Sequence, residues 1–226
     1  MEKVRIWDLP TRLFHWILVV AVVGMVVTGN IGGDAMNVHL RLGYLIATLL
    51  LFRLLWGVIG GHWSRFASFF PTPARLARYL RGQPSADDLA GHNPLGALSV
   101  LALLLVLGLQ VASGLFADDE IATSGPLTAR ASSAAVKLAS RYHTTLGKLL
   151  IIALVVLHIA AIVWHQRRGR NLVRPMVSGD KPKSQAGDVT ASRDDAGTRV
   201  LALVLLAVCA AVVYALVRWG ERAGMG

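Results

Sequence analysis

Five apolar segments, each about as long as a bilayer core demands, constrain this chain more than any other feature. They cover residues 13–30, 40–59, 95–116, 146–164 and 200–217, and none of them contains Asp or Glu. A membrane-spanning helix needs about 20 such residues. Because every backbone amide in lipid needs an internal partner, and because these runs are continuously apolar, each is predicted to be a helix and not a barrel strand. The sequence therefore predicts an all-α membrane protein.

The first segment follows Lys3 and Arg5, as the apolar part of a secretion signal does. Residues 29–33 after it contain no small-x-small cleavage pattern, and His15 and Trp16 are unusual in a leader. We therefore predict that this segment stays in the mature protein as a helix.

The net charge of +10 would suit a nucleic-acid partner, but the positions of the Lys and Arg residues indicate a membrane topology instead. With the N-terminus in the cytoplasm, fifteen of the 23 lie inside, six lie outside and two, Arg53 and Lys148, fall within spans. The positive-inside rule then predicts a multi-pass membrane protein, in contact with lipid, with a cytoplasmic N-terminus and the C-terminus outside. The inner residues are Lys3, Arg5, Arg12, Arg65, Arg75, Arg78, Arg81, Arg167, Arg168, Arg170, Arg174, Lys181, Lys183, Arg193 and Arg199, and the outer ones are Arg41, Arg130, Lys137, Arg141, Arg218 and Arg222.

The connections between spans differ in composition. In residues 60–91, arginines at helical spacing favour a short amphipathic helix over Ala74–Leu80, with a solvated basic loop as the alternative. Residues 117–142 are acidic and then basic, include an expected outer helix over 129–140, and form either a docking surface or a solvated loop. Residues 177–198 are rich in Gly, Ser and charged residues, which cannot bury a core, so a flexible cytoplasmic tether is predicted.

These features predict three parts: a four-helix transmembrane domain over residues 1–176, the tether over 177–198 and a fifth, C-terminal transmembrane helix over 199–226. The single cysteine, Cys209, lies in the last span, so one chain can build neither an internal disulfide nor a cysteine-rich zinc site.

Four histidines lie in or at the ends of the spans, where an imidazole is costly and indicates a function. His143 and His158 are fifteen residues apart on one predicted helix, which places them on one broad face about 22 Å apart along the axis. The predicted chain directions put His39 at the outer depth of His143 and His15 at the inner depth of His158. The pattern therefore predicts two sites of two histidines each.

Each pair can supply both axial nitrogens to one haem iron, which leaves no open position for oxygen and suits electron transfer. Gly43 and Gly147 follow His39 and His143 by four residues, so each lies on its ligand's face, where a missing side chain lets a flat macrocycle approach the backbone. We therefore predict two b haems, the outer one in contact with Gly43 and Gly147.

Arg53 shares the helix face of His39 but lies about 21 Å away along the axis, at the depth of the inner haem. No span offers it a carboxylate, so a haem propionate is its predicted partner. The alternative is that Arg53 snorkels to the headgroups. Arg12 and Arg41, which lie near His15 and His39, are either propionate partners or interfacial anchors.

Three further histidines have no assigned ligand role. His62 and His92 are predicted at cytoplasmic helix ends, where His92 precedes an Asn-Pro pair that begins the third helix. His165 follows His158 by seven residues on the same face. It is interpreted as an interfacial residue, with a rival ligand or a quinone or proton-relay group as alternatives.

Several linked motifs occur along the first four spans. They are Trp7-Asp8-Leu9-Pro10-Thr11-Arg12-Leu13-Phe14-His15-Trp16, the segment from His39-x-x-x-Gly43 to Arg53-Leu54-Leu55-Trp56-Gly57, and Tyr142-His143-Thr144-Thr145-Leu146-Gly147 with His158. Over roughly residues 5–176 they resemble the bacterial cytochrome b561 family, which includes the cytochrome b subunits of nickel-iron hydrogenases. The resemblance implies a four-helix transmembrane bundle with two b haems, ligated by the same His15, His39, His143 and His158. It also places the protein in the bacterial inner membrane, with the C-terminus in the periplasm.

The expected function is electron transfer between the quinone pool and a periplasmic partner such as a c-type cytochrome. The resemblance leaves open a hydrogenase or other dehydrogenase anchor, a superoxide:quinone oxidoreductase, and either a homo-oligomer or a subunit of a larger complex. A histidine-lined metal or proton transporter is disfavoured, because its path usually carries intramembrane carboxylates and the spans have none. A purely structural anchor would leave the paired histidines without a reason.

Overall fold

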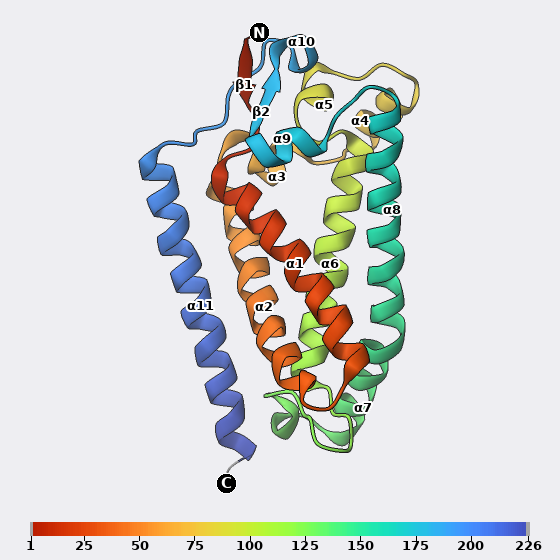
Figure 1. The fold of residues 1–226 in the computed structure, drawn as a ribbon, viewed down its shortest axis with the longest axis vertical. Coiled ribbons are helices and arrows are strands. Elements are labelled where there is room, and N and C mark those ends of the chain that lie inside the picture. The colour runs from red at the N-terminus through yellow and green to blue at the C-terminus, as the bar shows by residue number, and fades with distance from the viewer. Residues whose placement is uncertain (1, 225–226) are drawn as a thin grey trace. The chain divides into compact units, whose positions relative to one another are not determined.

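A computed structural model describes residues 2–224, and in that range five helices are long and apolar enough to cross a membrane (Figure 1). These are α1 (Leu9–Ile31), α2 (Ala35–Ile59), α6 (Pro94–Phe116), α8 (Lys148–Arg167) and α11 (Ala196–Gly224). Each of the five predicted spans coincides with one of them, so the predicted all-α membrane class is confirmed. Met1, the first residue of the first predicted domain, and residues 225–226, the last two of the third, lie outside the described residues.

Shorter elements occupy the connections. They are β1 (Lys3–Arg5), α3 (Phe66–Phe69), α4 (Pro73–Leu80), α5 (Ala86–Ala90), α7 (Ser133–Arg141), α9 (Val173–Ser178), β2 (Asp180–Pro182), α10 (Lys183–Ala186), two 3-10 turns at His62–Ser64 and Thr128–Arg130, and a π-helix at Tyr142–Gly147. The predicted helix over Ala74–Leu80 is confirmed as α4, which starts at a Thr72 cap with Pro73 in its first turn. The predicted outer helix is present as α7, which starts at a Ser132 cap.

The chain divides into two compact units, and each long helix contributes residues to both. The first unit comprises the described parts of Met1–His15, Arg53–Ala102 and Leu154–Val204. The second comprises those of Trp16–Phe52, Leu103–Ala153 and Leu205–Gly226. His15 and His158 belong to the first unit, and His39 and His143 belong to the second.

The first unit contains a small folded layer outside the long helices. Its strands β1 and β2 pair antiparallel, with Val4 opposite Lys181. A buried cluster lies against this pair, made of Val4, Ile6, Trp7, Trp63, Ala90 and Ala186. The layer therefore joins residues from both ends of the sequence around apolar side chains.

Residues 177–198, predicted to be a flexible tether, take part in this layer. The Trp63 indole donates to the Thr190 carbonyl at 2.7 Å, and the Ser192 amide donates to the Arg5 carbonyl at 2.8 Å. Ala186 is buried in the apolar cluster. The segment is ordered although it is poor in large apolar residues, because Trp63 and the N-terminal strand supply the apolar surface and the backbone supplies the hydrogen bonds.

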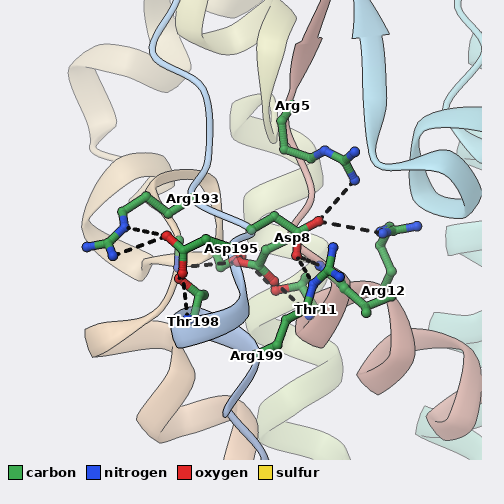
Figure 2. A network of polar contacts seen from close by, with 12 residues as sticks. Arg5, Asp8, Thr11, Arg12, Arg193, Asp195, Thr198 and Arg199 are labelled. Carbon is green, nitrogen blue, oxygen red and sulfur yellow. Dashed lines mark hydrogen bonds and ion pairs between the residues drawn. The ribbon is translucent and has the colours of Figure 1, made fainter. Parts of the chain in front are cut away.

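Asp8 explains the start of α1. Its carboxylate accepts a hydrogen bond from the Thr11 amide at 2.8 Å, which is the pattern of a helix N-cap, and it is fully buried (Figure 2). The same carboxylate accepts from the Ser64 hydroxyl at 2.7 Å and from the Trp56 indole and the Gly61 amide. The Trp-Asp-Leu-Pro segment therefore fastens α1 to the end of α2.

Asp194 is a second polar centre in the first unit. It accepts from the Arg5 guanidinium at 3.0 Å, from the Leu9 amide at 3.1 Å and from Arg199 at 3.1 Å. Arg12 lies 3.8 Å away as an ion pair. This one carboxylate joins β1, the start of α1 and the start of α11.

Candidate functional site

In the second unit, His39 on α2 and His143 in the π-helix face each other. Their ring centres are 6.1 Å apart and their planes are nearly perpendicular, at 85°. Two metal–imidazole bonds of about 2 Å, with a ring radius of roughly 1.2 Å, would place the centres of two trans ligands about 6 Å apart. The spacing of the pair therefore suits two axial ligands of one metal.

Backbone carbonyls orient both rings. Nδ1 of His39 lies 3.2 Å from the Met25 carbonyl oxygen, and Nδ1 of His143 lies 2.9 Å from that of Gln110. Because a carbonyl only accepts, each ring must carry its proton on Nδ1, which leaves Nε2 with a free lone pair. A second bond of this kind from the other ring nitrogen is the usual support of a metal-binding histidine.

Two glycines let the neighbouring helices approach these rings. A Cβ on Gly29 of α1 would stand 3.0 Å from Cε1 of His39, and one on Gly114 of α6 would stand 2.7 Å from Cε1 of His143. Both distances are shorter than ordinary contacts between nonbonded carbons. The two positions therefore exclude a side chain larger than hydrogen unless the ring moves.

The supports of the two rings repeat one short pattern. The residue whose carbonyl accepts from the ring is followed after three residues by a hydroxyl and after four by glycine, as Met25-x-x-Thr28-Gly29 in α1 and as Gln110-x-x-Ser113-Gly114 in α6. The Thr28 and Ser113 hydroxyls lie 3.3 and 3.4 Å from Nδ1 of their respective histidines. The two halves of the site are thus built alike.

A cavity of about 280 Å³ in the second unit is lined by residues of α1, α2, α6 and α8, and both His39 and His143 line it. Gly43, a predicted contact of the cofactor, also lines it, and a Cβ there would meet only the end of Met25, at 3.8 Å. The other predicted contact, Gly147, is buried, and a Cβ on it would collide with the Gln110 side chain and with Tyr142. Gly43 therefore leaves room on the cavity wall, whereas Gly147 permits close packing of α6 against the π-helix.

His39 and His143 offer two imidazole nitrogens as metal ligands in this cavity. In the described part of the chain, no group of three or more His, Cys, Asp or Glu side chains could hold a metal ion. His39 and His143 would hold a haem iron through their imidazole nitrogens, and the porphyrin would supply the remaining ligands. The two histidines therefore fit a haem.

His15 on α1 and His158 on α8 both belong to the first unit, and their pairing stays a prediction. Arg53, also in this unit, is 3% exposed, and its guanidinium lies 4.7 Å from the centre of the Phe66 ring. Its Nη1 atom is buried without a hydrogen-bond partner. Asp8, which precedes the first span, supplies a nearby negative charge that the spans themselves lack.

His92 also belongs to the first unit, although no ligand role was predicted for it. Its ring packs against Trp7 at 4.7 Å and against Phe69 at 4.5 Å between centres. Burial, followed by the charge of Arg53 and the proximity of His158 and His15, lowers the pKa of His92 to about 3. His92 is therefore neutral at physiological pH and has one N–H to donate.

The remaining arginines and histidines singled out in the sequence make other contacts or are exposed. Arg12 donates to the Val177 carbonyl at 2.6 Å and pairs with Asp194, while Arg41 is exposed. His165, near the end of α8, interacts with the positive charges of Arg168, Arg170 and Lys181. His62 lies beside the ring of Trp63.

Membrane-length helices and opposed, carbonyl-oriented histidines define a helical membrane protein suited to axial ligation of haem. The model of the prokaryotic cytochrome b561 family matches residues 6–179, and the chain belongs to this family. Membership in this family of b-type cytochromes implies haem b as the cofactor.

Curated relatives are named as hydrogenase subunits. The chain is similar to the probable Ni/Fe-hydrogenase B-type cytochrome subunit of Azotobacter vinelandii, with 27% identity over 137 residues that cover 46% of this chain and 57% of that protein. It is also similar to the probable Ni/Fe-hydrogenase B-type cytochrome subunit of Cupriavidus necator, with 25% identity over 216 residues that cover 79% and 87%. The chain thus spans little more than half of the A. vinelandii protein. No solved structure matches the chain.

Proposed function

We propose that this chain is a dihaem b-type cytochrome, with one haem held by His39 and His143 and the other by His15 and His158. The observation that carries the proposal is the shared orientation of His39 and His143, whose Nδ1 atoms face backbone carbonyls while their rings oppose each other at 6.1 Å. A bound haem iron supplies one-electron oxidation and reduction, and two axial histidines leave it no open position. This ligation suits electron transfer.

The surrounding residues hold the ligands and balance charge. The carbonyls of Met25 and Gln110 fix the tautomer and the direction of each ring before a cofactor binds. Arg53 is a buried cation whose Nη1 has no hydrogen bond, so a haem propionate at the His15/His158 site is its partner. Arg12 is engaged by Val177 and Asp194, and we assign it to the folded layer of the first unit.

We further propose that the electrons pass between quinol in the inner membrane and a periplasmic redox protein, such as a c-type cytochrome. Five membrane-length helices and the fifteen-to-six asymmetry of basic residues support a chain that crosses the membrane with its N-terminus in the cytoplasm. The names of the curated relatives favour a second candidate, the cytochrome b subunit of a hydrogenase complex. In native membranes, haem reduction by hydrogen gas would select the second candidate, and reduction by quinol alone would select the first.

The haem content tests the proposal directly. Detergent-purified protein should contain two non-covalent, low-spin b haems per chain by pyridine haemochrome quantitation. A value of one or none would contradict it.

Single substitutions test the pairing. His143→Ala should remove one haem and leave the other in place, and His158→Ala should remove the haem that the first variant keeps. Either change should stop electron transfer from quinol to a periplasmic acceptor. His165→Ala is the control and should keep both haems. Retention of both haems in His143→Ala would refute the assigned ligands.

A further inference from the structure

Contacts with two aromatic rings and with Arg75 hold His92 in place. Its ring lies against Trp7 and Phe69, which are 7% and 1% exposed. The Arg75 guanidinium donates to the His92 carbonyl at 3.5 Å and to the buried Asp88 at 2.6 Å. These contacts restrict both the backbone and the ring of His92.

Among the described residues of the first unit, the buried nitrogens without a hydrogen-bond partner include Nδ1 of His92 and Nη1 of Arg53. Nε of Arg12 is another, but the same guanidinium already donates to the Val177 carbonyl and pairs with Asp194. The Phe69 ring packs on His92 at 4.5 Å and lies 5.8 Å from the Phe66 ring, which in turn lies 4.7 Å from the Arg53 guanidinium, so these contacts join His92 and Arg53 in one cluster of the first unit. Buried polar atoms are nearly always hydrogen-bonded, and exceptions mark a binding site or an unseen partner.

Asp8, the carboxylate that interacts with Arg53 through charge, is already engaged by other donors. Asp8 already accepts hydrogen bonds from the amides of Thr11 and Gly61, the Trp56 indole and the Ser64 hydroxyl. Arg53 interacts with Asp8 through charge, yet its Nη1 remains without a hydrogen bond. The cluster therefore offers one neutral and one cationic donor to an incoming acceptor of negative charge.

We infer that His92 and Arg53 together bind one propionate carboxylate of the haem held by His15 and His158, with Nδ1 of His92 and Nη1 of Arg53 as the donors. This inference rests on the proposed function. A carboxylate matches the pair because it only accepts hydrogen bonds and neutralises the guanidinium. His92 is thereby a positioning residue for the cofactor and is not an axial ligand.

Two substitutions of His92 separate a hydrogen-bond donor from a packing residue. His92→Phe keeps a ring between Trp7 and Phe69 but removes the donor, whereas His92→Asn keeps an N–H near the position of Nδ1. His62→Phe is the matched control, since His62 also packs on a tryptophan, Trp63, but has no buried nitrogen without a partner among the described residues.

The readout is the rate at which excess apomyoglobin takes each haem from the detergent-purified chain. His143→Ala, which keeps only the haem of His15 and His158, identifies that phase. His92→Phe should lose this haem about tenfold faster, the effect of one lost hydrogen bond to a charged group. His92→Asn and His62→Phe should stay close to the unmodified rate. When Arg53→Gln is already present, His92→Phe should have a smaller effect, because both groups bind one carboxylate.

The possible results distinguish a failure of this inference from a failure of the proposed function. Fewer than two haems in the unmodified chain would refute the proposed function. With two haems present, an unchanged rate in His92→Phe, or additive effects with Arg53→Gln, would overturn the inference. Complete absence of one haem from both His92 variants would also overturn it, because His92 would then be a ligand.

Discussion

A methyl group on the Cα of Gly114 would stand 2.7 Å from Cε1 of His143. Nonbonded carbons prefer separations of about 3.5–4.0 Å, so the His143 ring occupies the space that any side chain at this position would need. The Gln110 carbonyl, one turn earlier in the same helix, holds that ring at 2.9 Å. Helix α6 thus positions an imidazole that belongs to another element.

Gly114→Ala should consequently weaken haem binding at the His39/His143 site. The ring must move away from the Gln110 carbonyl, at a cost of about 1–3 kcal/mol, which corresponds to roughly tenfold to hundredfold faster haem loss. Haem capture by apomyoglobin measures this rate. Gly108→Ala in the same helix is the control, because a Cβ at Gly108 meets nothing within 4 Å. Equal rates in the two variants would contradict the role of Gly114.

Removing the negative charge of Asp194 should loosen the folded layer of the first unit. Asp194→Asn removes the negative charge that pairs with Arg5 and Arg199, so it weakens both bonds. We expect faster amide hydrogen exchange in β1 and in residues 177–198. The adjacent Asp195→Asn is the control, since the Asp195 side chain is 51% exposed and that of Asp194 only 7%. Similar exchange in both variants would count against the central place of Asp194.

Acid should loosen the connection that contains α4 and α5. Burial opposes ionisation of Asp88, but hydrogen bonds from Ser85 and from Arg75 outweigh it, so the pKa of Asp88 lies below its ordinary value. A lowered pKa means that this stability is present above the unfolded pKa and is lost as the pH falls through the folded pKa. Hydrogen exchange in residues 68–92, corrected for intrinsic rates, should therefore accelerate below about pH 4.

Arg75→Gln should accelerate hydrogen exchange in the same residues at neutral pH. The substitution removes the guanidinium that pairs with the buried Asp88, which should lower the local free energy of unfolding by about 2 kcal/mol. Arg78→Gln is the control, since Arg78 is about half exposed and lies 3.7 Å from Asp88. If exchange in Arg75→Gln matched that of the unmodified chain at pH 7, the Arg75–Asp88 ion pair would not stabilise this connection.

The predicted topology follows from the charge distribution and is open to a direct test. A reporter that requires the periplasm should be active when joined after the last residue of the chain, and one that requires the cytoplasm should be active when the chain is cut at Ser184. The opposite result would reverse the assigned sides of the membrane. It would then place the His39/His143 site toward the cytoplasm and the His15/His158 site toward the periplasm.

Length and continuous apolarity along single helices predicted the five spans. The alternating directions of those helices predicted that His39 and His143 lie at one depth, and their rings do face each other, while their role as ligands stays a prediction. It could not identify Gly29 or Gly114, since the contact of a glycine with a ring on another helix depends on how the helices are rotated. The recurring hydroxyl-glycine pairs, Thr28-Gly29 and Ser113-Gly114, are the signal that was available.

The order of residues 177–198 was missed for a different reason. Composition alone shows that this segment cannot form its own core, and it does not; its partners, β1 and Trp63, are more than a hundred residues away in the sequence. His92 was set aside because its position at a helix end suggested exposure, whereas Trp7 and Phe69 cover its ring. Both cases involve long-range contacts that local pattern does not encode.

The pairing of Val4 with Lys181 fixes when the first unit can be completed during synthesis. At roughly 5–20 residues per second, a ribosome needs about 9–35 s to travel from one strand to the other. Strand β1 is translated before the spans α1, α2, α6 and α8, and its partner β2 is translated after them. The strand pair of the first unit can therefore form only once all four of these spans have been made.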